Sequence, residues 1–302
     1  MPEAIQPVDI PVSAGGVVVG SSRCNPCERG FRFGGRFEHF CVAFPNRALW
    51  IQPEHYPAFV ADSTKATLYG PGEEFERRAI DPAGGQADWM LFSTAIMEEV
   101  LAELNLLNRR RDEISFGRPY ARATPAVHLG RRSLHDAVRH DSPDLLYVEE
   151  AAINLLKTIL ALPAGERPKR PPTTCSRRHY DLVQETCAYL NRTSSENQSL
   201  TSIASAVGAS VFHLCRVFRR TTGRTIHRYR NELRLRDAVL ALEHGDQDLL
   251  TIALASGYSG HSHFTLAFRQ LFGVTPSQFR ERRRQRAHAL PCDQLTENVD
   301  GR

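Results

Sequence analysis

The chain has 302 residues, a formal net charge of +4 and 41% hydrophobic residues. This length predicts two domains. Its seven cysteines, an odd number spread along the chain, argue against a disulfide framework, and the sequence contains neither an apolar run long enough to cross a membrane nor a signal peptide. We therefore expect a cytoplasmic protein that has no membrane partner.

The region before residue 92 has the pattern of β-strands. Short apolar runs at residues 17–19, 40–44, 48–51, 59–61 and 67–69 are separated by Gly, Pro and Asn. Residues 31–92 also hold 12 of the 25 aromatic residues of the chain. These rings are enough for the core of a small barrel or sandwich, and some of them could instead line a ligand cavity.

Cys24 and Cys27 form a Cys-x-x-Cys pair, and His39, Cys41 and His55 are possible further metal ligands. A structural zinc site usually has two closely spaced ligand pairs, and no second pair follows here at a suitable distance. Metal binding, redox sensing and inert thiols are the three interpretations of the pair, of which the sequence favours inert thiols. We predict no metal and no cofactor.

After residue 92 the apolar spacing predicts helices at residues 92–108, 126–140 and 143–161. The third helix carries an apolar stripe at alternating steps of three and four, formed by Leu145, Val148, Ala152, Leu155, Ile159 and Leu162. A narrow stripe suits a homodimer interface through Leu145, Val148, Ala152, Leu155 and Ile159. Neighbouring leucines widen the face, and a wide face suits packing inside the domain, so both interpretations stay open.

A proline-rich segment at residues 163–175 predicts a solvated linker, because its composition does not support a helix. It separates residues 1–162, the expected effector-sensing and oligomerisation domain, from residues 176–288, the expected nucleic-acid-binding domain. The first helix of the second domain is predicted at residues 176–190.

The C-terminal part contains one short unit twice. Residues 202–208 recur as residues 251–257, and residues 214–225 recur as residues 264–275. In each copy a helix ends at a glycine and a second helix follows within a few residues, which predicts two helix-turn-helix units. Residues 225–243 between them predict one continuous helix.

The second helix of each unit has an outward face suited to nucleic acid. The first presents Phe212, Cys215, Arg216, Arg219 and Arg220, and the second presents His261, Ser262, His263, Leu266 and Arg269. A single helix with a basic face is usually a solvated surface helix. Two such units in tandem favour DNA binding.

Four segments carry a resemblance to a known family: Arg234-Leu235-x-x-Ala238, Ile252-Ala253-x3-Gly257-Tyr258-Ser259, Ser262-His263-Phe264-x3-Phe268-Arg269 and Gly273-Val274-Thr275-Pro276-Ser277-x-Phe279-Arg280. With them, residues 199–280 resemble the DNA-binding domain of the AraC/XylS family of bacterial transcription regulators. The resemblance implies that Phe212, Cys215 and Arg216, and in the second unit His261, Ser262, His263 and Leu266, face the bases of double-stranded DNA. Family members often have a basic residue where this chain has Leu266.

The resemblance also implies the rest of the architecture, an α+β multidomain protein. Its N-terminal domain would be a cupin-like β-barrel with appended helices that binds a small-molecule effector. Its C-terminal domain would be all-α with two helix-turn-helix units. RNA polymerase is an expected further partner, and activation is the working expectation, although the sequence leaves activation or repression open.

The charge distribution agrees with DNA binding. Residues 171–290 hold 17 arginines, no lysine and 9 acidic residues, a net charge of +8, whereas residues 1–170 have a net charge of −2. An enzymatic alternative, a DNA-alkylation repair protein, would need a reactive cysteine in a Pro-Cys-His-Arg context. Here Pro26-Cys27 and Pro291-Cys292 lack the following histidine and arginine, so we predict that the chain is not an enzyme.

Overall fold

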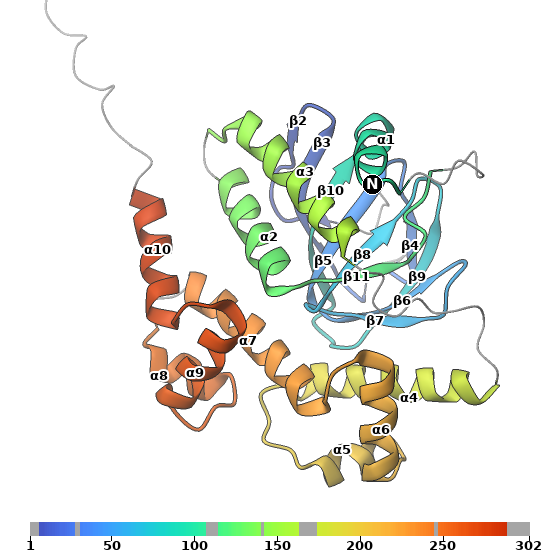
Figure 1. Cartoon of the computed structure of the whole chain (residues 1–302), viewed down its shortest axis with the longest axis vertical. Helices are drawn as coiled ribbons and strands as arrows, with labels where there is room; N and C mark the ends of the chain where they lie inside the picture. The colour runs from blue at the N-terminus through green and yellow to red at the C-terminus, as the bar shows by residue number, and fades with distance from the viewer. Residues whose placement is uncertain are drawn as a thin grey trace, which may run out of the picture. The chain divides into compact units, whose positions relative to one another are not determined.

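The computed structural model describes residues 6–27, 31–106, 114–139, 142–162, 174–244 and 247–288 (Figure 1). The chain divides into two compact units. Unit 1 comprises Met1–Thr193 and Gln198–Arg230, and unit 2 comprises Ser194–Asn197 and Asn231–Arg302. The first helix-turn-helix therefore belongs to the same unit as the N-terminal sheets. The linker predicted at residues 163–175 lies almost entirely outside the described residues.

Two antiparallel sheets form the N-terminal part of unit 1 (Figure 1). The larger sheet has the strand order β1-β3-β10-β5-β8-β11, with β2 paired to β3, and the smaller sheet has the order β4-β9-β6-β7. The strands are β1 Gln6–Pro7, β2 Val12–Ala14, β3 Val17–Cys24, β4 Phe33–Arg36, β5 Phe40–Arg47, β6 Leu49–Pro53, β7 Phe59–Ala61, β8 Lys65–Tyr69, β9 Glu74–Ala79, β10 Gly85–Phe92 and β11 Tyr120–Arg122.

The described strands do not form the closed barrel that was expected. Among these strands, no ladder of hydrogen bonds joins the two sheets. The short β7 is the last strand of the smaller sheet, and the chain then enters β8 of the larger sheet. The N-terminal part is therefore β-rich and built from two sheets.

Alternation along the strands of the larger sheet creates two cores. In β10, Met90 and Phe92 point into a core shared with the helices, while Trp89 points into a core between the two sheets. In β5, Val42 points into the core shared with the helices and Cys41 points into the core between the two sheets. Successive side chains of a strand point to opposite faces, so a sheet with both faces covered is apolar on both.

Helices α1 Thr94–Glu103, α2 Pro125–Val138 and α3 Leu145–Ala161 supply the core on the outer face of the larger sheet. The predicted dimer stripe on α3 is largely part of this core: Val148, Ala152, Leu155 and Ile159 are 0%, 0%, 7% and 0% exposed, and Leu145 alone of the five is 50% exposed. The prediction of a homodimer interface through these residues is therefore wrong. Neighbouring leucines widen the stripe into one apolar face, and the sheet and α2 cover it.

The helical part agrees with the repeat. Unit 1 contains α4 Thr174–Arg192, α5 Leu200–Ala206 and α6 Val211–Thr222, and unit 2 contains α8 Leu249–Ala255, α9 His261–Phe272 and α10 Pro276–His288. Helix α7 Ile226–His244 begins in unit 1 and continues into unit 2. The pairs α5–α6 and α8–α9 are the predicted helix-turn-helix units.

The turn glycines of the two units differ in their surroundings, which gives a first prediction. Gly208 and Gly257 have φ angles of +66° and +79°, so alanine at either position is strained by about 1–2 kcal/mol. A Cβ atom at Gly208 meets nothing within 4 Å, whereas at Gly257 it would lie 2.4 Å from the carbonyl oxygen of Ser195 and 2.7 Å from Nη2 of Arg234. Overpacking of this kind costs about 1–3 kcal/mol more.

We therefore expect Gly257→Ala to be the more destabilising of the two substitutions. The measurement is urea unfolding of the full chain, with Gly208→Ala as the matched control for backbone strain. Equal losses of unfolding free energy would contradict the close approach at Gly257.

Candidate nucleic-acid interface

The first helix-turn-helix unit is held by local hydrogen bonds. The Ser199 side chain accepts the backbone N–H of Ser202 at the start of α5, and the Ser210 side chain accepts that of His213 at the start of α6. These serines cap donors that the first turn of a helix leaves without partners. The axes of α5 and α6 are bent by 85°. This angle lets α6 project beyond the unit, as a recognition helix does.

The outer face of α6 consists of the predicted residues. Leu214, Val217 and Phe218 are buried, whereas Arg216, Arg219 and Arg220 are exposed and Cys215 is partly exposed. The remaining residue of this face, Phe212, is 77% exposed, and the Arg216 guanidinium lies 5.8 Å from the centre of its ring. The stacking restricts Arg216 to the outer side of the helix. The face therefore combines three cations with one large apolar side chain.

The outer face of α9 is equally exposed but carries less charge. Phe264, Ala267 and Phe268 face the core of unit 2, and the outer face presents His261, Ser262, His263, Leu266 and Arg269. Leu266 is 58% exposed. Arg269 is the single arginine of this helix, so α9 offers mainly neutral hydrogen-bonding groups and one apolar side chain.

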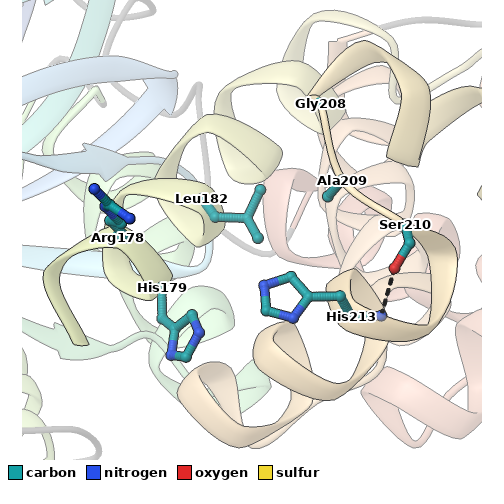
Figure 2. A pocket seen from close by; sticks show the side chains of 7 residues that line it. All are labelled: Arg178, His179, Leu182, Gly208, Ala209, Ser210 and His213. Atoms are coloured by element: carbon teal, nitrogen blue, oxygen red, sulfur yellow. Dashed lines mark hydrogen bonds between the residues drawn. The ribbon is translucent and has the colours of Figure 1, made fainter. Parts of the chain in front are cut away.

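A groove of about 680 Å³ lies beside α6, between α4 and the helix-turn-helix turn (Figure 2). It is lined by Arg178, His179 and Leu182 of α4, by the turn residues Gly208, Ala209 and Ser210, and by His213 of α6. Figure 2 shows the imidazole rings of His179 and His213 from the two helices near each other, and their centres are 5.3 Å apart. Two imidazoles and a guanidinium beside the first turn of α6 suit a phosphate oxygen.

Arg234 of α7 organises unit 2. Its side chain is 7% exposed, and its guanidinium donates to the carbonyl oxygens of Ser194 at 2.5 Å, Glu196 at 2.9 Å and Gly257 at 2.9 Å. Tyr258, which follows Gly257 in the chain, donates its hydroxyl hydrogen to Oδ1 of Asn231 of α7 at 2.5 Å. The turn of the second helix-turn-helix is thus fixed to the connecting helix.

A buried carboxylate joins the sheets to the helices of unit 1. Asp62 follows β7 and is 0% exposed. Its carboxylate accepts hydrogen bonds from the Tyr229 hydroxyl of α7, from Thr64 and from Asn191 of α4, and Lys65 Nζ lies 3.1 Å from its Oδ2 atom. Burial raises the pKa of Asp62, but Lys65 and the hydrogen bonds from Tyr229 and Thr64 outweigh it and lower the pKa to about 2.

Sequence comparisons identify these helices. Residues 203–282 match the family model described as a helix-turn-helix domain. The probable transcription factor PqrA of Proteus vulgaris is 37% identical over 86 residues, which cover 28% of this chain and 70% of PqrA. The chain belongs to the AraC/XylS family of transcription regulators. The predicted family is therefore confirmed, and with it a DNA-binding function in transcription regulation.

Two further relatives are similar to this AraC/XylS regulator. The transcriptional activator RhaS of Pectobacterium carotovorum is 30% identical over 148 residues, which cover 49% of this chain and 51% of RhaS. The solved structure of an AraC-type transcriptional regulator from Chromobacterium violaceum has 30% identity, a TM-score of 0.34 and coverage of 36% of this chain and 97% of that one. The chain spans 22% of the length of an uncharacterised Staphylococcus aureus regulator that it also matches.

Sequence reasoning had not assigned the groove residues Arg178, His179 and His213. The basic run at residues 177–179, at the start of a predicted helix, was the available signal. Among the residues that the structure describes, no group of three His, Cys, Asp or Glu side chains is placed to hold a metal ion. No single helix in the described part of the chain is long and apolar enough to cross a membrane, and α5 and α6 reach that length only as a bent pair.

Proposed function

We propose that this regulator reads duplex DNA with the outer faces of α6 and α9 and that a small molecule bound by its N-terminal sheets controls this binding. The observation that carries the proposal is the repeated exposed helix face, which is rich in arginine on α6. An α-helix fits the major groove, where arginine can donate two hydrogen bonds to guanine. RNA polymerase is the expected partner at a promoter.

The two helices are proposed to contribute unequally. Arg216 is exposed at the middle of the α6 face and stacks on Phe212, so it can reach a base edge. Arg219 and Arg220 lie one turn further on and suit backbone phosphates, as does the groove beside α6. Leu266 at the equivalent position of α9 offers only apolar contact, for example to a thymine methyl group. The first unit should therefore dominate sequence discrimination.

Arg216→Ala is expected to weaken binding to the specific site by about 1–3 kcal/mol and to relax the preference at one base pair, because a bidentate contact to guanine is lost. Leu266→Ala should change the affinity less. Each variant would be titrated at fixed salt on a duplex selected from a random library by the wild-type chain and on a scrambled duplex.

Arg220→Ala is the matched control, since it should weaken both duplexes about equally. If Arg216→Ala also weakens both duplexes alike, the assigned role in base recognition is wrong. If the wild-type chain selects no duplex, the proposed function itself fails.

The N-terminal part supports the effector half of the proposal. A small cavity lined mainly by apolar and aromatic side chains lies between the two sheets. Strand β7 connects this cavity to the DNA-binding helices: Ala61 lines the cavity, Val60 donates its N–H to Gln184 of α4 at 2.8 Å, and Asp62 accepts from Tyr229 of α7. A change in the cavity that moves β7 would therefore reach α4 and α7.

A further inference from the structure

The cavity between the two sheets contains a cluster that DNA binding does not use. It is lined by Cys24 at the end of β3, Cys41 of β5, Arg77 of β9 and Trp89 of β10, among apolar neighbours. Its volume is about 60 Å³. A water molecule needs only about 10–15 Å³ measured in this way, whereas an engineered site that binds benzene has about 150 Å³. At this volume, the cavity is suited to a molecule a few times the size of water.

The two thiols that line the cavity are both buried, but their environments differ. Cys41 is 1% exposed, and burial raises the pKa of its thiol well above the ordinary range. Cys24 is 7% exposed, and Nη1 of Arg77 donates to its Sγ atom at 3.1 Å. A guanidinium N–H pointed at sulfur stabilises the thiolate, which is the nucleophilic form. Arg77 thus distinguishes Cys24 from Cys41.

Two further groups favour chemistry at Cys24. Cys27 is exposed and is separated from Cys24 by Asn25 and Pro26, the Cys-x-x-Cys spacing in which one thiol can attack the other. Trp89 is 5% exposed, and its indole Nε1 atom has no hydrogen-bond partner among the described residues. A buried N–H donor without a partner is costly, and Trp89 is among the residues that line the cavity.

We propose that Cys24 is a thiol that reacts with small hydroperoxides and that Cys27 resolves the product to a Cys24–Cys27 disulfide. The sulfur of Cys24 attacks one peroxide oxygen, forming an S–O bond while the O–O bond breaks. The other oxygen leaves with a proton as water, or as an alcohol from an organic hydroperoxide. The peroxide is reduced by two electrons and Cys24 is oxidised to a sulfenic acid.

The second step needs no further reactant. The Cys27 thiol gives its electron pair to the Cys24 sulfur, so the S–S bond forms and the S–O bond breaks. The hydroxyl group leaves with the Cys27 proton as water. This modification goes beyond the proposed DNA-binding function, and its readout is chemical. Failure of either proposal is therefore distinguishable from failure of the other.

The test uses the full reduced chain and hydrogen peroxide. After brief treatment, remaining thiols are blocked with N-ethylmaleimide and the protein is digested with trypsin. Trypsin cleaves after Arg23 and after Arg29, so residues 24–29 form one peptide that contains both cysteines. We expect this peptide to be lighter by two hydrogen atoms and to carry no maleimide. Recovery of the peptide with two maleimides would overturn the proposal.

Variants separate the two roles. Cys27→Ser should leave Cys24 as a sulfenic acid that dimedone labels, and Cys24→Ser should leave Cys27 reduced. Cys41→Ser is the matched control for a buried thiol of the same cavity and should form the disulfide as the wild type does. Equal dimedone labelling of Cys24 and Cys41 in the Cys27→Ser protein would also refute the assignment.

Arg77→Met should slow the oxidation of Cys24 by roughly tenfold or more, since the thiolate loses its cation. Arg77→Lys retains the charge and should react faster than Arg77→Met. Circular dichroism shows whether each variant is folded, and oxidation of a folded Arg77→Met protein at the wild-type rate would contradict the role of Arg77. If neither arginine variant folds, the cysteine variants still decide the proposal.

Discussion

Replacing Asp62 with alanine is expected to lower the free energy of unfolding by about 3–5 kcal/mol, because it leaves the Lys65 ammonium group without its buried partner. The Lys65 side chain is 10% exposed and that of Asp62 is 0% exposed. The substitution also removes the acceptor of the Tyr229 hydroxyl, so the residue that follows β7 loses its contact with α7. Urea unfolding followed by circular dichroism measures the loss.

Glu103→Ala provides the control. Its carboxylate is paired with Lys157 at 2.6 Å, but the two side chains are 56% and 30% exposed. Pairs with this exposure contribute about 0–1 kcal/mol, so the control should remain close to the wild type. Similar losses in both variants would mean that the buried position of Asp62 has no special energetic importance.

The same carboxylate predicts a dependence on pH. The pKa of Asp62 is about 2 in the folded chain, below the value of about 3.9 expected in the unfolded chain. The unfolded state therefore binds the proton more readily, and the stabilisation is complete above about pH 4 and is lost as the pH falls towards 2. It amounts to about 2–3 kcal/mol, and Asp62→Asn should remove this part of the acid sensitivity.

Arg234→Ala is expected to lower the unfolding free energy of unit 2 by about 3 kcal/mol or more. A hydrogen bond from a charged donor contributes about 1.5–3 kcal/mol, and this guanidinium donates to three backbone carbonyl groups. Hydrogen exchange of peptides from residues 247–288 would report the loss directly. Arg234→Lys should recover only part of it, since an ammonium group lacks the planar fork of donors.

Arg269→Ala is the control for Arg234→Ala, because Arg269 is exposed on α9 and belongs to the proposed DNA contacts. It should change the unfolding free energy by less than about 0.5 kcal/mol while weakening DNA binding. If Arg234→Ala exchanges as slowly as this control, Arg234 does not hold unit 2 together.

The helical half of the fold was predictable because its signals are local. Apolar residues at helical spacing, together with Gly208 and Gly257, defined two helix-turn-helix units, and the same periodicity assigned the outer faces of α6 and α9. The strands β9 and β10 were missed. Strand β9 is largely charged, and β10 carries the buried Asp88 between apolar neighbours, so neither reads as an uninterrupted apolar run.

The long-range contacts were not predictable from the sequence. The stripe on α3 has the spacing of an interface, but only the fold shows that the larger sheet already covers it. The bond between Asp62 and Tyr229 joins residues 167 positions apart, and neither residue stood out in its own segment. The same holds for Cys24 and Arg77, 53 positions apart. The spacing of residues along the chain predicts helices and strands. These pairs instead depend on which helices and strands pack against one another in the fold.

The bond between Asp62 and Tyr229 also bears on how the protein is made. A ribosome adds about 5–20 residues per second, so Tyr229 is synthesised roughly 10–30 seconds after Asp62. Until then the Asp62 carboxylate and Lys65 lack the aromatic side chain that covers them in the finished chain. We expect the nascent sheets to keep this end hydrated, and α7 to close it only when Tyr229 has left the ribosome. A chain truncated before residue 229 would then carry its sheets with an open, charged end.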